Sequence, residues 1–132
     1  MDKEIVTLSV EISKQRVSDL LVSAFEGGSN SWYLIEIFDA PTDAKEAASE
    51  FRHATYPIST DGGVWVSNAK EERRGSKDYK SVRVGWQRCK EALRIMSEKY
   101  PRHFANWREE NDDADTGDCF LQCCVFGEMI YG

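Results

Sequence analysis

Residues 4–38 read EIVTLSVEISKQRVSDLLVSAFEGGSNSWYLIEIF, and this stretch contains the pattern that decides the fold class. Over residues 4–12, apolar side chains alternate with polar ones, which is the period of a half-buried strand. Ser13 then offers an N-cap to a helix whose apolar residues recur every three or four positions as far as Phe25. Residues 31–38 are rich in aromatic and β-branched side chains and predict a second strand.

The middle of the chain predicts shorter elements. We expect a helix over 42–53 with Thr42 as its N-cap, because this stretch is rich in alanine. A turn at 61–63 leads into a short strand over 64–66. Residues 68–81 are polar and charged and predict a loop.

The last third of the chain predicts helices only. A long helix is predicted from residue 82, because apolar residues recur at spacings of three and four and would share one of its faces: Val82, Trp86, Cys89, Leu93, Met96 and Tyr100. Pro101 ends this helix, and proline in a first turn allows another helix over 102–110. Thr116 or Asp118 is expected to cap a final helix through 119–126, which is apolar on nearly all sides and hence buried.

These elements predict an α+β fold, with a small, mainly antiparallel sheet of about three strands, helices packed on it and an all-helical C-terminal half. The short helix between the first two strands also permits a right-handed parallel crossover, and the pattern does not decide between the two. A chain of 132 residues predicts a single domain over 1–132.

The N-terminal residues lack a basic start followed by an apolar run, and no segment approaches the roughly 20 apolar residues of a membrane span. We therefore expect a cytoplasmic protein with no membrane partner. The four cysteines, Cys89, Cys119, Cys123 and Cys124, would suit a disulfide framework only in an exported chain, and the adjacent Cys123 and Cys124 cannot easily bridge each other. We therefore expect all four to be reduced, small, buried residues.

The net charge of −6 conceals an uneven distribution. Residues 1–69 carry 5 basic and 11 acidic side chains, residues 70–102 carry 11 and 5, and residues 103–132 carry 1 and 7. The middle segment is thus a basic island between acidic flanks, a pattern that bears on partners. The alternative is that the island neutralises the flanks within one fold or across a subunit interface.

Three apparent motifs fail on inspection. The glycines of EGGSN (residues 26–30) follow a helix end, so Gly27 or Gly28 is expected in the left-handed conformation rather than in a phosphate loop. The acidic run 109–118 lacks the glycine and glutamate of a calcium loop and predicts a helix-capping turn. The cysteines and the two histidines lack zinc-site spacing, and no nucleophile and base are paired. We predict no catalytic residue, metal or cofactor.

Aromatic side chains interleave with the basic island. Trp65 and Tyr79 flank or lie in the loop that contains the first arginines of the island, and more arginines follow. Guanidinium groups and aromatic faces suit a stacked base with its phosphates, whereas an acidic protein is a poor match for duplex nucleic acid. The predicted binding residues for a small anionic nucleotide are Ser29, Asn30, Trp32, Trp65, Arg73, Arg74, Arg83, Trp86 and Arg88.

Several segments together resemble a widespread family of small phage and prophage proteins, most of which have no assigned function. They are RVSDLL (16–21), AFEGGSNSWY (24–33), IMSEKYPRHF (95–104) and TGDCFLQCCVFGEMIYG (116–132). Residues 40–80 match only loosely. The resemblance implies a phage accessory protein that acts inside a bacterial host cell, and small phage proteins without an evident active site are often counter-defence factors.

Three functions are compatible with this resemblance. The first is a non-catalytic, homo-oligomeric sponge that sequesters a cyclic nucleotide-like immune signal. The second is an acidic protein that inhibits a host defence protein, such as a nuclease or CRISPR effector, by occupying its basic groove. The third is an enzyme that degrades the signal, for which we find no base or metal. We predict the sponge.

Overall fold

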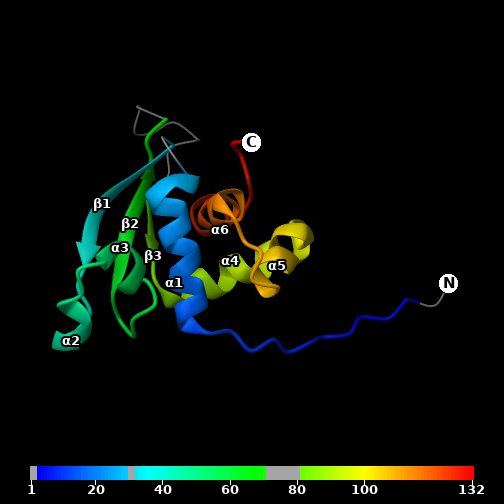
Figure 1. Ribbon diagram of the computed structural model, residues 1–132, viewed down its shortest axis with the longest axis horizontal. Coiled ribbons are helices and arrows are strands. Elements are labelled where there is room, and N and C mark those ends of the chain that lie inside the picture. Colours follow the sequence, from blue (N-terminus) through cyan, green and yellow to red (C-terminus); the bar gives the residue numbers. More distant parts are fainter. Residues whose placement is uncertain (1–2, 30–31, 71–80) are drawn as a thin grey trace.

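The computed structural model describes residues 3–29, 32–70 and 81–132. Three antiparallel strands form one sheet in chain order: β1 (Tyr33–Asp39), β2 (Gly63–Asn68) and β3 (Ser81–Val84). Four helices lie on one side of it (Figure 1): α1 (Lys14–Ser23), α4 (Trp86–Lys99), α5 (Pro101–Arg108) and α6 (Ala114–Phe126). The predicted α+β class, the antiparallel sheet and the helical C-terminal half are therefore confirmed. Within the described residues, no helix is long and apolar enough to cross a lipid bilayer.

The strands are not all the expected ones. Residues 3–12 are extended but pair with no strand of the described chain, and the side chains of Ile5 and Leu8 are 97% and 79% exposed. The strand predicted over 4–12 is thus wrong for this structure, because alternation indicates a pleated segment without supplying it with a partner. The third strand is instead β3 (Ser81–Val84), where the sequence predicts the end of a loop and the start of a helix.

The first helix follows the prediction closely. The hydroxyl of Ser13 accepts a hydrogen bond from the backbone of Arg16 and caps α1 (Lys14–Ser23), whose apolar face is fully buried. A π-helical turn, η1 (Ala24–Gly28), continues it. The left-handed conformation predicted for Gly27 or Gly28 is not found at Gly27, whose φ of 170° is extended.

Strand β1 (Tyr33–Asp39) and strand β2 (Gly63–Asn68) pair along their length, with a bulge in β1 between Ile35 and Ile37. Val64 and Val66 of β2 are fully buried under the helices, whereas Trp65 lies on the other face of the sheet. Trp65 is paired across the strands with Arg83 of β3. The indole of Trp65 and the guanidinium of Arg83 therefore lie side by side on the sheet face opposite to the helices.

The helix predicted over 42–53 is wrong in extent. Two short helices replace it, α2 (Ala44–Ala47) and α3 (Arg52–Thr55). Asp43, not Thr42, caps α2, because the Thr42 hydroxyl donates instead to the carboxylate of Asp61. This contact joins the α2 segment to the turn before β2.

Three helices complete the chain: α4 (Trp86–Lys99), α5 (Pro101–Arg108) and α6 (Ala114–Phe126). Pro101 stands in the first turn of α5, as expected. α6 begins earlier than predicted, because Asp113 rather than Thr116 or Asp118 caps it. All four cysteines lie in the described residues, and each is free and buried, as the sequence predicts.

A buried polar network fastens the C-terminal residues to α6. The Gln122 side chain is fully buried, and its Oε1 accepts from the backbone nitrogens of Ile130 at 2.8 Å and Tyr131 at 2.9 Å. Its Nε2 donates to the Tyr131 carbonyl and to Asp118, whose other carboxylate oxygen accepts from Trp32 at 2.7 Å. The distinctive segments around residues 32, 118–122 and 131 therefore meet in one network.

Candidate functional site

A pocket of about 480 Å³ lies where the β2–β3 hairpin passes into α4. Its lining comes from the turn before β2, the end of β3 and the first turns of α4: Thr60, Asp61, Gly62, Arg83, Gly85, Trp86, Gln87, Arg88 and Glu91. Three of the nine residues predicted to bind a ligand, Arg83, Trp86 and Arg88, are thus brought together at one cavity.

Gly85 separates β3 from α4 and opens the N-terminus of the helix toward the pocket. Its backbone is extended, with φ −121° and ψ −169°, and it has no side chain with which to cap α4. The first backbone N–H groups of a helix lack intrahelical acceptors and carry the positive end of its dipole. The pocket therefore meets the uncapped end of a 14-residue helix, a setting that favours an anion.

Arg83 is held in a fixed position. Its Nε donates to Asp39 Oδ2 at 2.9 Å, and its Nη2 donates to the carbonyl of Asp61 at 3.0 Å. The Nε1 of Trp65 donates to the same Asp39 oxygen at 2.9 Å. Asp39 therefore positions both the guanidinium and the indole, and it offsets the charge of Arg83, although both charged side chains remain more than one third exposed.

Two glycines make room for this guanidinium. A Cβ at Gly63 would lie 2.9 Å from Arg83 Cζ, and a Cβ at Gly85 would lie 3.0 Å from Arg83 Nη1. Side chains at either position would therefore push the guanidinium aside. The sequence shows both glycines, but we interpreted the first only as part of a turn and the second as an interior helix residue.

Arg88 differs from Arg83, because its guanidinium makes no hydrogen bond or ion pair with the described residues. It is exposed on the first turn of α4, beside the half-buried ring of Trp86. The Nζ of Lys14 lies 5.2 Å from the centre of that ring. The pocket therefore has one guanidinium without an ion pair among the described residues, and one ammonium group lies close to its aromatic wall.

The two acidic side chains of the pocket have other partners. Glu91 binds Arg94 one turn further along α4, and this hydrogen bond lowers the pKa of the Glu91 carboxyl. The Asp61 carboxylate accepts from the hydroxyl and the backbone nitrogen of Thr42, which lowers its pKa. Both groups are ionised near neutral pH, so an anionic ligand would avoid their side of the cavity.

Of the remaining predicted residues, Ser29, Trp32 and Trp65 do not line the pocket. Trp32 is 3% exposed at the start of β1, the opposite end of the sheet from the pocket, where it is a member of the Gln122 network. Ser29 is buried, and its hydroxyl has no hydrogen-bond partner among the described residues. Asn30, Arg73 and Arg74 fall outside the described residues.

The residues on either side of the undescribed segment 71–80 can be placed. Lys70 follows the end of β2, and Ser81 begins β3. Both therefore lie at the end of the hairpin opposite to Gly63 and Gly85, which are at the pocket. The predicted site combined Arg73 and Arg74 with Arg83 and Arg88, whereas the described residues that flank 71–80 lie at the end of the strands away from the pocket.

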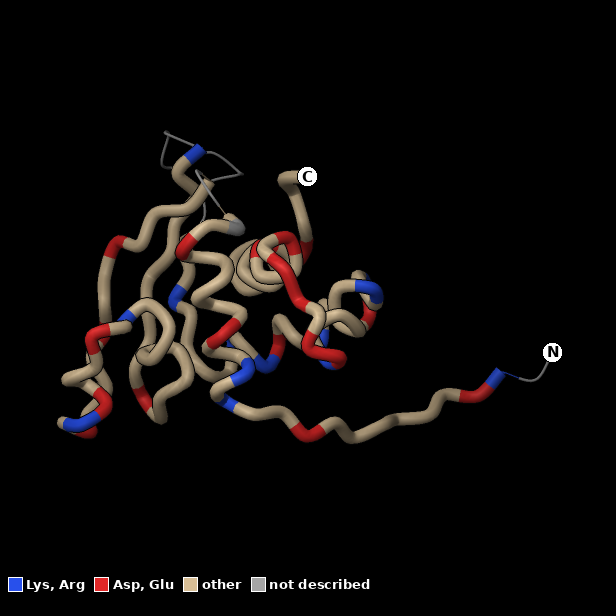
Figure 2. Tube along the Cα trace, viewed as in Figure 1, with Lys and Arg blue, Asp and Glu red and all other residues tan. Residues whose placement is uncertain are grey.

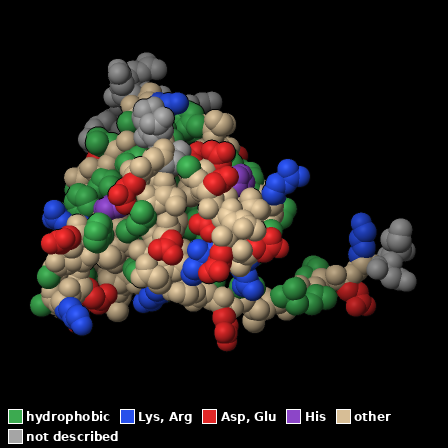
Figure 3. Space-filling view, in the orientation of Figure 1, with side chains coloured by type: hydrophobic (Ala, Val, Ile, Leu, Met, Phe, Trp, Pro, Cys, Tyr) green, Lys and Arg blue, Asp and Glu red, His purple; other side chains and the backbone are tan. Residues whose placement is uncertain are grey.

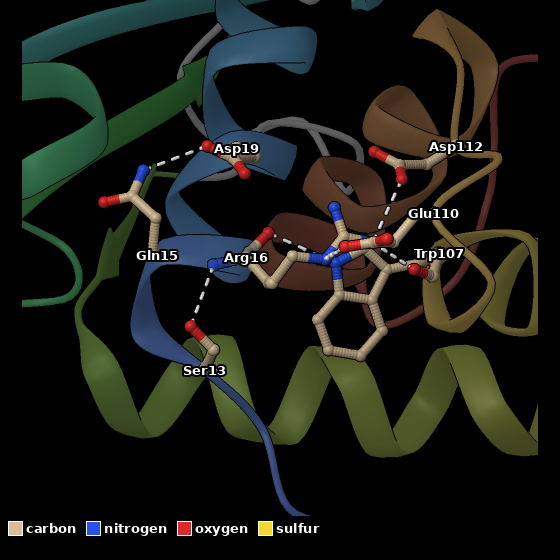
Figure 4. Close-up of polar contacts among 7 residues, drawn as sticks. All are labelled: Ser13, Gln15, Arg16, Asp19, Trp107, Glu110 and Asp112. Atoms are coloured by element: carbon tan, nitrogen blue, oxygen red, sulfur yellow. Dashed lines mark hydrogen bonds and ion pairs between the residues drawn. The ribbon is translucent and has the colours of Figure 1, made fainter.

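A second cluster of charges lies at the start of α1 and has a structural role (Figure 4). Arg16 donates to the backbone carbonyl of Trp107 and lies 3.2 Å from the carboxylate of Asp112, which is largely buried. The indole of Trp107 donates back to the carbonyl of Arg16 at 3.1 Å. These contacts attach α1 to the turn between α5 and α6.

The acidic run 109–118 is used in the same way. Asp112 pairs with Arg16, and Asp113 caps α6 by accepting from the backbone of Thr116, which lowers the pKa of the Asp113 carboxyl. In the part of the chain that the structure describes, no three His, Cys, Asp or Glu side chains gather in a way that could hold a metal ion. The expected helix-capping role is confirmed.

Comparison with known proteins adds no information to this geometry. No protein-family model, curated protein or solved structure matches the chain. The likeness to small phage proteins therefore stays a prediction from the segments quoted above. The pocket at the start of α4 is the feature on which a functional proposal can rest.

Proposed function

We propose that this protein sequesters a small anionic, nucleotide-like ligand in the pocket at the start of α4, without chemical conversion. In a phage setting, such a ligand would be a cyclic nucleotide-like immune signal of the bacterial host, and the protein would act as a counter-defence sponge. The observation that carries the proposal is the convergence of an uncapped helix N-terminus, Arg83, Arg88 and Trp86 on one cavity.

Each group has a separate part in binding. The first N–H groups of α4 and the unpaired Arg88 guanidinium bind a phosphate, since both offer donors to oxygen atoms and positive charge. Arg83, fixed by Asp39, offers its remaining N–H donors in a set direction. The half-buried indole of Trp86 provides a face or edge for a base.

The size of the pocket suits this class of ligand. Small-molecule sites commonly enclose about 300–1,000 Å³, and this cavity of about 480 Å³ falls in the lower half of that range. It would hold one nucleotide unit better than an extended strand. A larger cyclic ligand would need a further surface, such as that of a second copy.

Thermal shift and calorimetry with cyclic dinucleotides, cyclic ADP-ribose isomers and inorganic phosphate test the proposal. A ligand present at 100 times its Kd stabilises the folded state by about 2.7 kcal/mol, which raises Tm by several degrees. Arg88→Ala should abolish the shift. Arg102→Ala is the matched control, because Arg102 is an exposed arginine on α5, away from the pocket.

The outcomes separate the parts of the proposal. If no ligand of the panel raises Tm, or if Arg88→Ala binds as well as the wild type, the pocket is not the binding site. Arg73→Ala combined with Arg74→Ala asks whether the two predicted arginines outside the described residues take part. Mass spectrometry of the recovered ligand distinguishes sequestration from degradation, because only an enzyme returns an altered nucleotide.

Inhibition of a host protein by acidic mimicry is the alternative. Figure 2 shows acidic residues gathered along the connection between α5 and α6. Asp112 and Asp113 are already engaged in the fold, so the exposed carboxylates of this region are Glu109, Glu110 and Asp115. This alternative predicts a host protein that co-purifies with the chain. Its affinity should fall as the salt concentration rises, and it should also fall in the double variant Glu109→Gln, Asp115→Asn.

A further inference from the structure

Residues 3–12, called the arm below, leave apolar side chains in solvent. Ile5, Val6 and Leu8 are 97%, 72% and 79% exposed, and Val10 is 46% exposed. Figure 3 shows the hydrophobic side chains of the arm apart from the body of the molecule. Folded chains rarely expose a contiguous apolar segment of this kind unless it contacts another molecule, so the arm is built for a partner surface.

A groove along α1 is the surface that fits the arm. Two adjoining cavities, of about 350 Å³ and 310 Å³, share Thr55 and Ile58 in their lining. One wall is a stripe of α1 and η1 from Lys14 to Glu26, and the other belongs to the α2–α3 segment. Phe51, in that segment, is 59% exposed in the single chain. We call this the α1–α3 groove.

The arm and the groove agree in length and in charge. From Lys14 to Glu26 the helical wall extends for about 18 Å, and the apolar stretch from Val6 to Val10 extends for about 13 Å. Lys14 and Lys45 lie at the end of the groove nearest to the start of α1, beside a single Glu46, whereas Glu26 lies at the far end. The arm carries Glu11 near α1, whereas Lys3 and Glu4 at its far end offset each other, so the charge match lies at the entrance of the groove.

The arm of the same chain cannot reach this groove without a reversal. Ile12 packs against the core, and Ser13 caps α1, so the direction of the arm is fixed where it leaves the helix. A reversing connection of about 2–6 residues would have to lie within residues 3–11, and it would shorten the apolar stretch left to lie along the groove. In Figure 1 the arm departs on the side of α1 opposite to α3.

We propose that the arm of one copy binds the α1–α3 groove of a second copy and that the exchange is reciprocal. A two-fold axis near the two α1 N-termini places each arm over the groove of the other copy, starting at Lys14, and closes the assembly at two chains. Val6, Leu8 and Val10 then face the apolar floor of the groove, and Glu11 meets the lysines at its entrance.

Sedimentation equilibrium of the full chain tests this exchange. The expected mass is twice the 15.1 kDa of one chain. Leu8→Asp and Phe51→Asp should each yield single chains, because a carboxylate would enter an apolar contact. Both positions are exposed in the single chain, so neither substitution disturbs its core. Ser9→Asp, on the opposite face of the arm, is the matched control and should retain the mass of two chains.

A mixture of the two defective variants makes the test specific. The Leu8→Asp chain retains an intact groove and the Phe51→Asp chain an intact arm, so one arm and one groove can still join, and their mixture should recover association that neither variant shows alone. A wild-type mass of one chain, or of more than two, overturns the proposal. So does a Leu8→Asp dimer. If the Phe51→Asp variant is a dimer while the Leu8→Asp variant is a single chain, the arm binds a surface other than the groove. That result overturns the assignment to the groove.

Discussion

Replacement of Gln122 by leucine tests whether the buried network really fastens the C-terminal residues. Gln122 is fully buried and makes four hydrogen bonds, three of them with the backbone of residues 130 and 131. Leucine has a similar volume but no polar atom, so three backbone groups lose their partners. At about 1 kcal/mol for each net hydrogen bond, the free energy of unfolding falls by about 3 kcal/mol.

The loss is limited by release of the tail. Ile130 is already 43% exposed, so residues 128–132 can leave α6 and recover water as a partner, at the expense of the partly buried side chains of Tyr131 and Met129. Thermal denaturation should show a fall in Tm of about 10 °C for a chain of this size. Gln15→Leu is the control, because Gln15 is exposed and makes one hydrogen bond to Asp19.

The pH dependence of the stability of a Gln122→Glu variant tests the same network. The introduced carboxyl retains its two backbone donors but faces Asp118 and the Tyr131 carbonyl, where Gln122 donated. Burial and the neighbouring carboxylate raise the pKa of such a group above its unfolded value. The penalty is therefore small in acid and grows as the pH rises through the folded-state pKa. If Gln122→Leu unfolds within about 2 °C of the wild type, the network does not hold the tail and this reasoning fails.

Three further changes test local structure. Arg16→Ala should lower the free energy of unfolding by about 2–3 kcal/mol in urea denaturation, because it leaves the largely buried Asp112 and the Trp107 carbonyl without their donor; a loss no larger than that of Arg102→Ala would contradict this. Asp113→Ala should cost about 1 kcal/mol through the lost cap of α6. Because the pKa of Asp113 is lowered in the folded state, its contribution is present above the unfolded pKa and is lost in acid, so wild type and variant should converge as the pH falls. Gly85→Ala should displace the Arg83 guanidinium, weaken ligand-induced thermal shifts and leave the backbone unstrained, since φ −121° is open to alanine; unchanged binding would show that the position of Arg83 does not matter.

Much of the fold could be predicted because it depends on local periodicity. The apolar spacing of α1, its Ser13 cap and the proline at the start of α5 are signals within a few residues, and the structure confirms each. Residues 3–12 show the limit of this approach. Their alternation is genuine, but a strand also needs a partner strand, and the sequence of one segment does not determine which segment pairs with it.

The second failure has a different cause. Val82 lies four residues before Trp86, so it fits the face of the following helix by chance, and its β-branched shape suits a strand equally well. Gly85 was the discriminating signal, because a glycine between a β-branched run and a helical run favours a boundary over a helix interior. Recognition of that boundary would also have located the pocket.

The candidate site could be predicted only in part, because long-range ion pairs decide which charges are available. Arg83 and Arg88 look equivalent in the sequence, yet Arg83 is bound to Asp39 of β1, whereas Arg88 makes no hydrogen bond or ion pair with the described residues. Arg94 is likewise held, by Glu91 and Glu98 on its own helix. The described part of the basic island therefore contains arginines that are paired with carboxylates and one, Arg88, that is not, and sequence spacing alone does not tell them apart.

This difference between the two arginines implies that most of the affinity for an anion comes from the N-terminus of α4. A ligand that approaches Arg83 meets a guanidinium whose charge Asp39 already offsets, so its contribution is mainly directional. Arg88 makes no ion pair with a described residue, its charge interacts with that of Glu91 one turn away, and the dipole of the 14-residue helix adds positive potential from its uncapped end. Binding that depends on Arg88 more than on Arg83 would therefore follow from the pairing seen here, and the reverse order would place the ligand elsewhere on the sheet.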